Sequence, residues 1–356
     1  MSDVRKILVT GASGYVGGRL VTSLLEDNAQ VRVFVRDANK AQSHSWASKV
    51  EIAVGNASDY QSTVKALTGI HTAFYLLHSI NSGTNFDKIE SDMARSFAKA
   101  AQEANVKQII YLGGINNDAK TSKHLKSRAN TGKELATTDV AVLELRAGII
   151  IGSGSASFEM LRHLTHRLPI MTTPKWVMNR THPIAIRDVL WYLKNAAKLE
   201  KPVSAVFDIG GPEVLKYSEM MNGYAVEAGM KERAILRLPV LTPYLASQWV
   251  NLVTPIPRAL AVPIIASLQH DCVMNEHDVD EIIPPPAEGL LPYRTAVALA
   301  QGTMEQGDIE NNRHKKSACC WNMGACAPMS ARVAKPGRHF GRRPDYRRHH
   351  KKYARD

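Results

Sequence analysis

The chain has 356 residues, of which 44% are hydrophobic and 22% are charged, and this composition excludes a disordered chain, a collagen-like repeat and a disulfide scaffold. The net charge of +12 comes almost wholly from residues 313–356, which hold 13 basic and two acidic side chains, so residues 1–312 carry a net charge of only +1. The part of the chain that can fold therefore lacks the charge typical of nucleic-acid-binding proteins, and we expect no nucleic-acid partner.

Strand-like and helix-like segments alternate along the first two thirds of the chain. Apolar runs predict strands at 6–9, 31–35, 50–54, 73–77, 108–112, 140–145 and 205–209. Apolar residues at helical spacing predict helices at 16–25, 59–68, 87–104, 126–136, 158–167 and 188–197. In the helix at 87–104, one face carries Ile89, Met93, Phe97, Ala100 and Ala104. Such alternation is typical of an α/β fold, here a Rossmann-type doubly wound parallel sheet with helices on both faces.

The sequence predicts that the chain is organised in three parts. Residues 1–150 form the NAD(P)-binding Rossmann core, and residues 151–310 add interleaved strands and a smaller, mostly helical lobe on the substrate side. Residues 311–356 form a basic tail in which apolar residues recur neither at helical nor at strand spacing, and we expect this tail to be disordered. The tail fits either an arm that binds anionic surfaces or an out-of-frame end of the chain.

Hydropathy and cysteine content predict a cytoplasmic protein. The sequence contains no run of 18 apolar residues, and Met1 to Arg5 lacks the pattern of a secretory leader. Cys272 is the single cysteine before residue 313, which argues against structural disulfides. We therefore expect no membrane span and a small-molecule substrate, while a protein partner stays open.

A glycine-rich turn, TGASGYVG at residues 10–17, joins the first predicted strand to the first helix. Gly11 allows the tight turn, Gly14 allows backbone to approach a pyrophosphate, and Gly17 allows the helix to pack closely. The N–H groups at the start of the helix face the anion. The turn therefore predicts a dinucleotide site, with contacts from Gly11, Ser13, Gly14, Tyr15, Val16 and Gly17.

Residues after the next three strands predict the rest of the cofactor site. Arg36 ends the second strand, where an arginine accommodates the 2′-phosphate of NADP and an acidic residue holds the ribose of NAD. Because Asp37 follows, NADP(H) is favoured and NAD(H) stays open. By topology, we expect Asn56 near the adenine, and Leu77 and His78 near the ribose of the cofactor.

These motifs resemble the atypical short-chain dehydrogenase/reductases. The resemblance rests on the glycine turn, on Arg36, and on YLLHS at 75–79, LRAG at 145–148 and FDIGGPE at 207–213. Within that class the chain is similar to the NmrA-like NAD(P)-binding group, which is akin to the Rossmann-fold accessory subunit of respiratory complex I. The resemblance covers roughly residues 4–300 and implies a nicotinamide dinucleotide in the crevice at the carboxyl ends of the strands.

The catalytic pattern of that family is not kept. The resemblance implies a serine after the fifth strand and a Tyr-x-x-x-Lys pair on the next helix, but here Gly113 stands at the serine position and His124 and Arg128 stand at the spacing of the pair. As catalytic residues, His124 with its ordinary pKa of about 6.5 would be a general acid and Arg128 would bind the nicotinamide ribose. Alternatively both only hold cofactor or cap loops. Tyr111 is another candidate proton donor, or a core residue.

Three further features predict structure rather than chemistry. Arg146 lies inside an apolar strand, so we expect it to pair with a carboxylate across the sheet, with a ligand phosphate as the alternative. His163, His166 and His182 lack cysteines or carboxylates at ligand spacing, so no metal site is expected. Asp188 is predicted to begin a helix, as a cap or as a first-turn acid.

The sequence therefore favours an NAD(P)-binding, oxidoreductase-like protein that transfers hydride between NADP(H) and a carbonyl or quinone-type acceptor. The alternative is a non-catalytic sensor of NAD(P)(H) or an assembly factor. The absence of the family's serine and Tyr/Lys pair from this sequence favours this alternative. A sugar-nucleotide epimerase is a third hypothesis, which the missing Tyr/Lys pair disfavours. Whether the chain is an enzyme stays open at this point.

Overall fold

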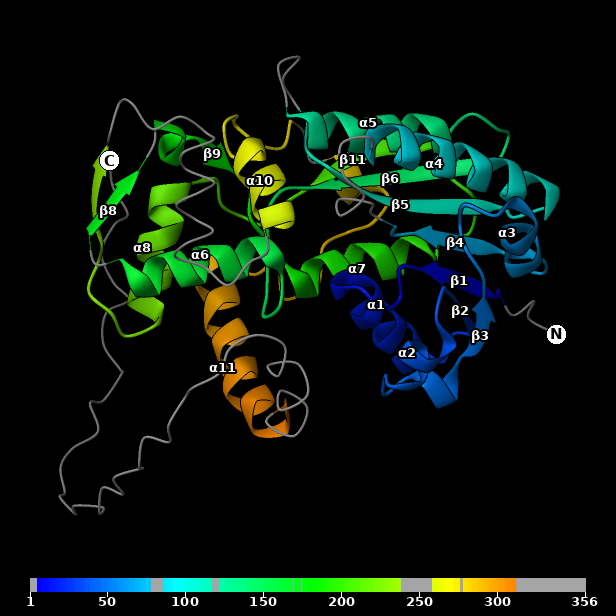
Figure 1. Ribbon diagram of the computed structural model, residues 1–356, viewed down its shortest axis with the longest axis horizontal. Helices are drawn as coiled ribbons and strands as arrows, with labels where there is room; N and C mark the ends of the chain where they lie inside the picture. The colour runs from blue at the N-terminus through cyan, green and yellow to red at the C-terminus, as the bar shows by residue number, and fades with distance from the viewer. Residues whose placement is uncertain are drawn as a thin grey trace, which may run out of the picture. The chain divides into compact units, whose positions relative to one another are not determined.

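The structure is a computed structural model and describes residues 5–77, 86–116, 122–168, 170–173, 175–237, 258–275 and 278–311 (Figure 1). Of the described strands, seven form one sheet in the order β11-β6-β5-β4-β1-β2-β3, and every pair in it is parallel. These strands are β1 (Ile7–Thr10), β2 (Val31–Val35), β3 (Glu51–Val54), β4 (Thr72–Tyr75), β5 (Gln108–Gly114), β6 (Ala141–Ala147) and β11 (Ala205–Ile209). The order reverses between β1 and β4, and ligands of such sheets bind at the carboxyl ends of the strands beside this point.

Helices cover both faces of the sheet, because successive side chains of a strand point to opposite sides. In β1, Ile7 and Val9 pack into one apolar core, whereas Leu8 packs into another. Helices α1 (Tyr15–Glu26) and α7 (Ile186–Ala196) cover the first face, and α3 (Tyr60–Leu67), α4 (Phe86–Glu103) and α5 (Lys123–Leu135) cover the second (Figure 1). The predicted doubly wound parallel sheet is confirmed.

A third apolar core belongs to the smaller lobe. It holds Phe158, Leu161, Tyr224, Ile265 and Val297. These side chains come from helices α6 (Ala156–Arg167), α8 (Tyr217–Glu227), α10 (Arg258–Ser267) and α11 (Tyr293–Asn311). The predicted helical character of this lobe is therefore confirmed.

Short elements complete the described chain. The short strands pair as β7 (Ile150–Ile151) with β10 (Ile184–Ala185), β8 (Ile170–Thr173) with β13 (Ala234–Arg237), and β9 (Arg180–Thr181) with β12 (Leu215–Lys216). The short helices are α2 (Ala38–Gln42) and the 3-10 turns at Ala47–Lys49, Lys175–Met178 and Asp278–Glu281. Strands of two residues are too short to show a period, so the sequence did not predict them.

Two boundaries near the catalytic candidates differ from the sequence prediction. Strand β5 continues to Gly114, and helix α5 begins at Lys123 rather than at 126. The earlier start has a local cause, because Ser122 caps the helix by accepting a hydrogen bond from the Leu125 amide (3.3 Å). His124 consequently lies in the first turn of α5.

The segment before α11 is bonded to helix α7 of the Rossmann core. The indole of Trp191 donates to the Pro284 carbonyl (2.9 Å), and the Leu291 amide donates to the Asp188 carboxylate (2.8 Å). Asp188 is fully buried in the first turn of α7, as predicted, and is also paired with Arg187 (2.7 Å). Residues distant in sequence thus complete the core.

No helix in the described ranges is both long and apolar enough to cross a bilayer.

Candidate functional site

The glycine turn leaves no space for side chains at two of its glycines. Gly11 has φ +66°, and a Cβ there would lie 2.5 Å from the Leu76 carbonyl oxygen. A Cβ on Gly17 would lie 2.2 Å from the Gly11 carbonyl oxygen, so helix α1 packs directly on the turn. Gly14 is the N-cap of α1 and offers no side-chain cap, which leaves the first amides of the helix to meet an anion.

A cavity of about 600 Å³ lies against this turn. We call it the glycine-turn cavity. Its lining brings together six of the residues predicted to bind cofactor, namely Gly11, Ser13, Gly14, Arg36, Asn56 and Leu77. Ile89 and Met93 of α4 also line it, and Ile89 is 40% exposed. Met93 also packs against the apolar core beneath α4, so the predicted apolar face of this helix is shared between the core and the cavity.

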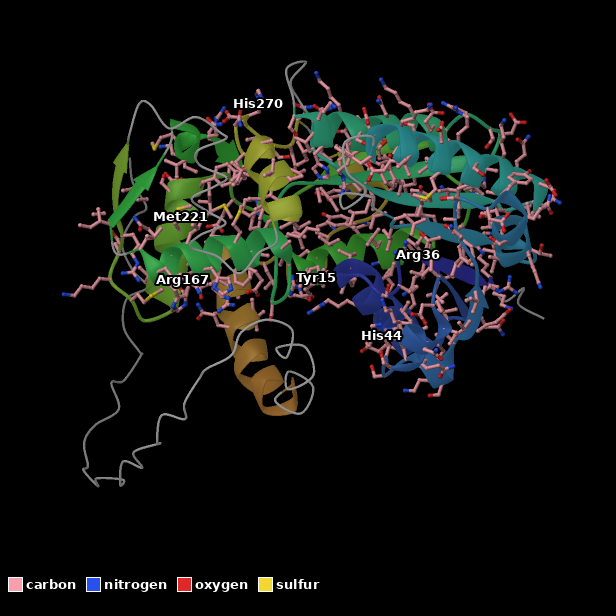
Figure 2. The ribbon with its side chains drawn as sticks, in the orientation of Figure 1. Tyr15, Arg36, His44, Arg167, Met221 and His270 are labelled. Atoms are coloured by element: carbon pink, nitrogen blue, oxygen red, sulfur yellow. The ribbon has the colours of Figure 1, made fainter. Side chains whose placement is uncertain are left out.

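Two other residues of the predicted cofactor set point elsewhere. The ring of Tyr15 lies under the guanidinium of Arg19 (4.2 Å), and its hydroxyl is buried beside Gly152. Figure 2 labels Tyr15, which begins helix α1. Burial raises the pKa of Tyr15 to about 12. Val16 lines a different cavity, described below. His78, also predicted to contact cofactor, lies outside the described residues.

The two charged residues at the end of β2 are in different surroundings. Arg36 is exposed and lines the glycine-turn cavity. The carboxylate of Asp37 instead caps helix α2, where it accepts hydrogen bonds from the amides of Asn39 (2.9 Å) and Lys40 (3.2 Å). The acidic residue that kept NAD open in the sequence is therefore engaged by the backbone of its own helix.

Asn56 is partly engaged as well. Its side-chain oxygen accepts from the Ser58 amide (3.1 Å). A carbonyl oxygen can accept a second hydrogen bond and the amide nitrogen can donate, so Asn56 keeps the groups that would recognise a base edge.

A second cavity, of about 300 Å³, opens beyond the carboxyl ends of β5 and β6. We call it the helix-α5 cavity. His124 and Arg128 of α5 both line it, as do Val16, Gly113 and residues of the lobe. Val16 and Gly14 are two residues apart and line different cavities, so the glycine turn separates the two spaces.

His124 does not keep the ordinary pKa that the sequence argument assumed. Burial and, secondarily, the positive charge of Arg128 lower the pKa of His124 to about 4. The ring is therefore neutral near pH 7. Its buried Nδ1 has no hydrogen-bond partner in the part of the chain that the structure describes. Arg128 donates a hydrogen bond to the Leu112 carbonyl at the end of β5.

Tyr111 is a core residue. It is 1% exposed, and its hydroxyl donates to the Arg128 carbonyl (3.0 Å), one turn along α5 from His124. Burial raises the pKa of Tyr111 to about 12. Its contacts are those of a structural residue rather than of a proton donor.

The carboxylate of Glu144 lies beneath the serine position. Glu144 is 4% exposed and accepts from Arg146 Nε (2.8 Å). Burial raises the pKa of Glu144, and the charge of Arg146 opposes this shift. The predicted carboxylate partner of Arg146 is confirmed, but it lies two residues back in β6 and not across the sheet. The sequence analysis missed Glu144, although an arginine in an apolar strand signals such a partner.

The other histidines singled out in the sequence have partners of their own. His166 contacts the Tyr224 hydroxyl (2.9 Å), and His163 contacts Arg162 (3.0 Å). The described residues include no group of three or more His, Cys, Asp or Glu side chains that could hold a metal ion.

Known proteins resemble the chain in sequence and in fold. Residues 11–143 match the model of a family described as NAD(P)H-binding. The ceramide reductase of Caulobacter vibrioides is 26% identical over 249 residues, which cover 67% of this chain and 75% of that protein.

Two solved structures have a similar fold. One is a Citrobacter sp. triphenylmethane reductase complexed with NADP(H) (TM-score 0.64, 19% identity, 83% of this chain and 99% of that one). The other is an NADPH-dependent quinone oxidoreductase of Escherichia coli complexed with NADPH (TM-score 0.64, 18% identity, 82% of this chain and 98% of that one). The chain therefore carries a domain that matches an NAD(P)H-binding family, and its fold is similar to the folds of these two reductases.

Proposed function

We propose that the chain is an NADP(H)-dependent oxidoreductase that transfers hydride between its cofactor and a carbonyl or quinone-type acceptor. The observation that carries this proposal is the pair of cavities on either side of the glycine turn. An extended dinucleotide needs one space for its adenosine end and another for its nicotinamide end, with the pyrophosphate on the helix N-terminus between them. The crowding at Gly11 and Gly17 fits this arrangement, since a Cβ at either position would close the turn.

The surroundings of Arg36 support a preference for NADP(H). Its guanidinium belongs to the cavity lining, while the carboxylate of Asp37 is held by the amides of α2. A 2′-phosphate would therefore meet a cation at this edge rather than an acid. The quinone oxidoreductase and the triphenylmethane reductase that share the fold are both described with NADP(H) or NADPH, which agrees with this choice.

The residues around the helix-α5 cavity suggest how the acceptor is activated. Bound there, a reduced nicotinamide would supply a hydride, and a proton from water would complete the reduction of a carbonyl to an alcohol or of a quinone to a hydroquinone. In this proposal the neutral His124 ring donates a hydrogen bond to the acceptor oxygen. Arg128 stabilises the negative charge that forms on that oxygen during transfer.

A fluorescence titration with NADPH and, separately, with NADH tests the cofactor assignment. We expect NADPH to bind at least about tenfold more tightly than NADH. An absorbance assay of NADPH oxidation with aldehydes, ketones and quinones then tests the reaction, and His124→Phe should lose turnover while it keeps NADPH affinity. Absence of binding by both cofactors would refute the proposal.

A non-catalytic sensor or assembly factor is the second candidate. Gly113 at the serine position and the low pKa of His124 favour it, because neither residue can supply a proton readily at neutral pH. NADPH binding without turnover of any acceptor in the assay above would support this function over the first. Epimerisation of a sugar nucleotide is disfavoured, since His124 and Arg128 replace the Tyr/Lys pair that such chemistry uses.

A further inference from the structure

We infer that the helix-α5 cavity takes an uncharged carbonyl compound with a large apolar body, whose oxygen is bound by His124 and Arg128. The reduction of that compound rests on the function proposed above. The choice of ligand rests on the cavity itself, through its walls, its charges and the hydrogen bonds of its polar side chains.

Apolar side chains from two separate parts of the chain form the walls. Leu112 of β5 and Ile115 just after it form one wall, and Ile264 of α10 and Leu268 just after that helix form the other. Burial of apolar ligand surface between such walls is the main source of affinity in small-molecule sites. The two walls therefore favour a ligand with an apolar body rather than a small polar one.

A hydrogen bond holds the two walls together. Ser122 Oγ, at the N-cap of α5, contacts Ser267 Oγ of α10 (3.1 Å). Ser122 lies two residues before His124. The apolar wall of the lobe is thus fixed close to the polar residues of α5, so one ligand can contact both.

Most polar groups on the lobe side are already bonded within the protein. Ser155 Oγ donates to the Ile150 carbonyl (2.8 Å), and Ser267 Oγ donates to the Pro263 carbonyl (2.9 Å). Burial raises the pKa of Cys272 to about 11, so its thiol stays protonated and behaves as a small apolar group. These side chains add little demand for polar atoms on the ligand.

The polar side chains of α5 differ, because one of them lacks a partner. His124 Nδ1 is buried without a hydrogen-bond partner among the described residues, which is costly for a polar atom. An acceptor oxygen beside His124 would meet this need. The charge of Arg128, one helical turn further on, favours the same oxygen over a donor group.

The charges around the cavity exclude other ligands. No Asp or Glu is among its described lining residues, and Arg128 is the one Lys or Arg side chain there, so a cationic ligand would be repelled. A carboxylate would be attracted to Arg128 but would lose its hydration between apolar walls. A neutral ketone or aldehyde is neither repelled by Arg128 nor deprived of the hydration that a charged group needs.

Three ketones distinguish these cases. We would titrate 2-nonanone, acetone and 4-oxononanoate into the full-length protein saturated with NADP⁺, by calorimetry, so that no reduction takes place. We expect 2-nonanone to bind at least about tenfold more tightly than either of the others. Stronger or equal binding of acetone or of 4-oxononanoate would overturn the inference, as would binding of none of the three.

Variants test which walls are responsible. Ile264→Asn should weaken 2-nonanone binding at least about tenfold. Leu299→Asn is the matched control, since Leu299 of α11 is 55% exposed and does not line this cavity. Equal effects of the two variants would contradict the assignment of α10 as a wall. If Ile264→Asn lowers the melting temperature, the comparison of the three ketones on the unaltered protein still decides the question.

The same ketones, incubated with NADPH, separate this inference from the proposed function. Reduction of acetone or 4-oxononanoate in preference to 2-nonanone would refute the inference and leave hydride transfer standing. Tight binding of 2-nonanone without reduction of any ketone or quinone would leave the inference standing and refute hydride transfer.

Discussion

The carboxylate of Glu144 occupies the space that a side chain on Gly113 would need. A Cβ at position 113 would lie 2.6 Å from Glu144 Oε1, and a Cβ on Gly132 of α5 would lie 2.1 Å from Oε2. Both glycines therefore admit one buried carboxylate between the sheet and helix α5. The serine position of the family is filled here by a neighbouring strand's side chain, which explains why glycine stands there.

Restoring the serine should consequently damage the fold rather than repair a site. We expect Gly113→Ser to lower the free energy of unfolding by about 2 to 3 kcal/mol, because the new side chain crowds a closely packed interior. Urea unfolding would measure the change. When Glu144 is first replaced by alanine, the same Gly113→Ser change should cost much less, and an equal cost in both backgrounds would show that the two side chains do not compete.

Arg36 should determine cofactor choice. Arg36→Ala removes the cation at the edge of the glycine-turn cavity, so NADPH affinity should fall roughly tenfold or more while NADH affinity changes little. Lys40→Ala is the matched control, because Lys40 is exposed nearby on α2 but does not line the cavity. Fluorescence titrations of both variants would measure this. A similar loss for Lys40→Ala would point to general electrostatic attraction instead.

His124 should make the folded state sensitive to mild acid. Its pKa is about 4 when folded and about 6.5 when unfolded, so below pH 6.5 the unfolded chain takes up the proton first. The contribution of the neutral His124 ring to the free energy of unfolding is fully present above pH 6.5. It is lost progressively as the pH falls toward 4. Between about pH 7.5 and about pH 5, this loss should reach about 2 kcal/mol.

The variant His124→Gln isolates this effect, since glutamine does not titrate. The free energy of unfolding should fall less between the two pH values in His124→Gln than in the unaltered protein, by about the amount given above. Denaturant unfolding at each pH provides the four values required. If both proteins lose the same stability, other groups are responsible for the acid sensitivity.

Gly17 should tolerate no side chain. Because a Cβ there meets the Gly11 carbonyl oxygen at 2.2 Å, Gly17→Ala should cost about 3 kcal/mol or more and should abolish NADPH binding. Gly302→Ala is the contrasting change, since Gly302 lies in α11 with nothing within 4 Å of its added Cβ. Alanine favours helix, so that variant should gain about 0.5 to 1 kcal/mol. Thermal unfolding would distinguish the two, and equal melting temperatures would contradict the packing argument.

The sequence predicted the sheet well because its central strands β1, β4 and β5 are buried on both faces and read as short apolar runs. It predicted the glycine turn for a similar reason, since φ and close approach at Gly11 and Gly17 restrict the residue type locally. Side-chain direction was harder to predict. Tyr15 and Val16 follow Gly14 directly, yet helical geometry turns their side chains away from the glycine-turn cavity.

Contacts between distant segments could not be predicted from local pattern. The pairing of Asp37 with the amides of α2 depends on a helix of five residues, too short to show a period. Pro263 lies inside helix α10, although a proline commonly ends a helix. The wall that α10 adds to the helix-α5 cavity therefore became visible only in three dimensions.

The bond from the Leu291 amide to the Asp188 carboxylate sets a lower limit on the length of chain that can fold. A protein that stops before residue 291 would keep the wholly buried Asp188 in α7 but would lose one hydrogen-bond donor to its carboxylate. If residue 284 were also removed, the indole of Trp191 would lose its hydrogen-bond acceptor. Losing a donor to a buried carboxylate costs more than losing one at the surface. A shortened version that keeps helix α7 should therefore also retain the start of α11.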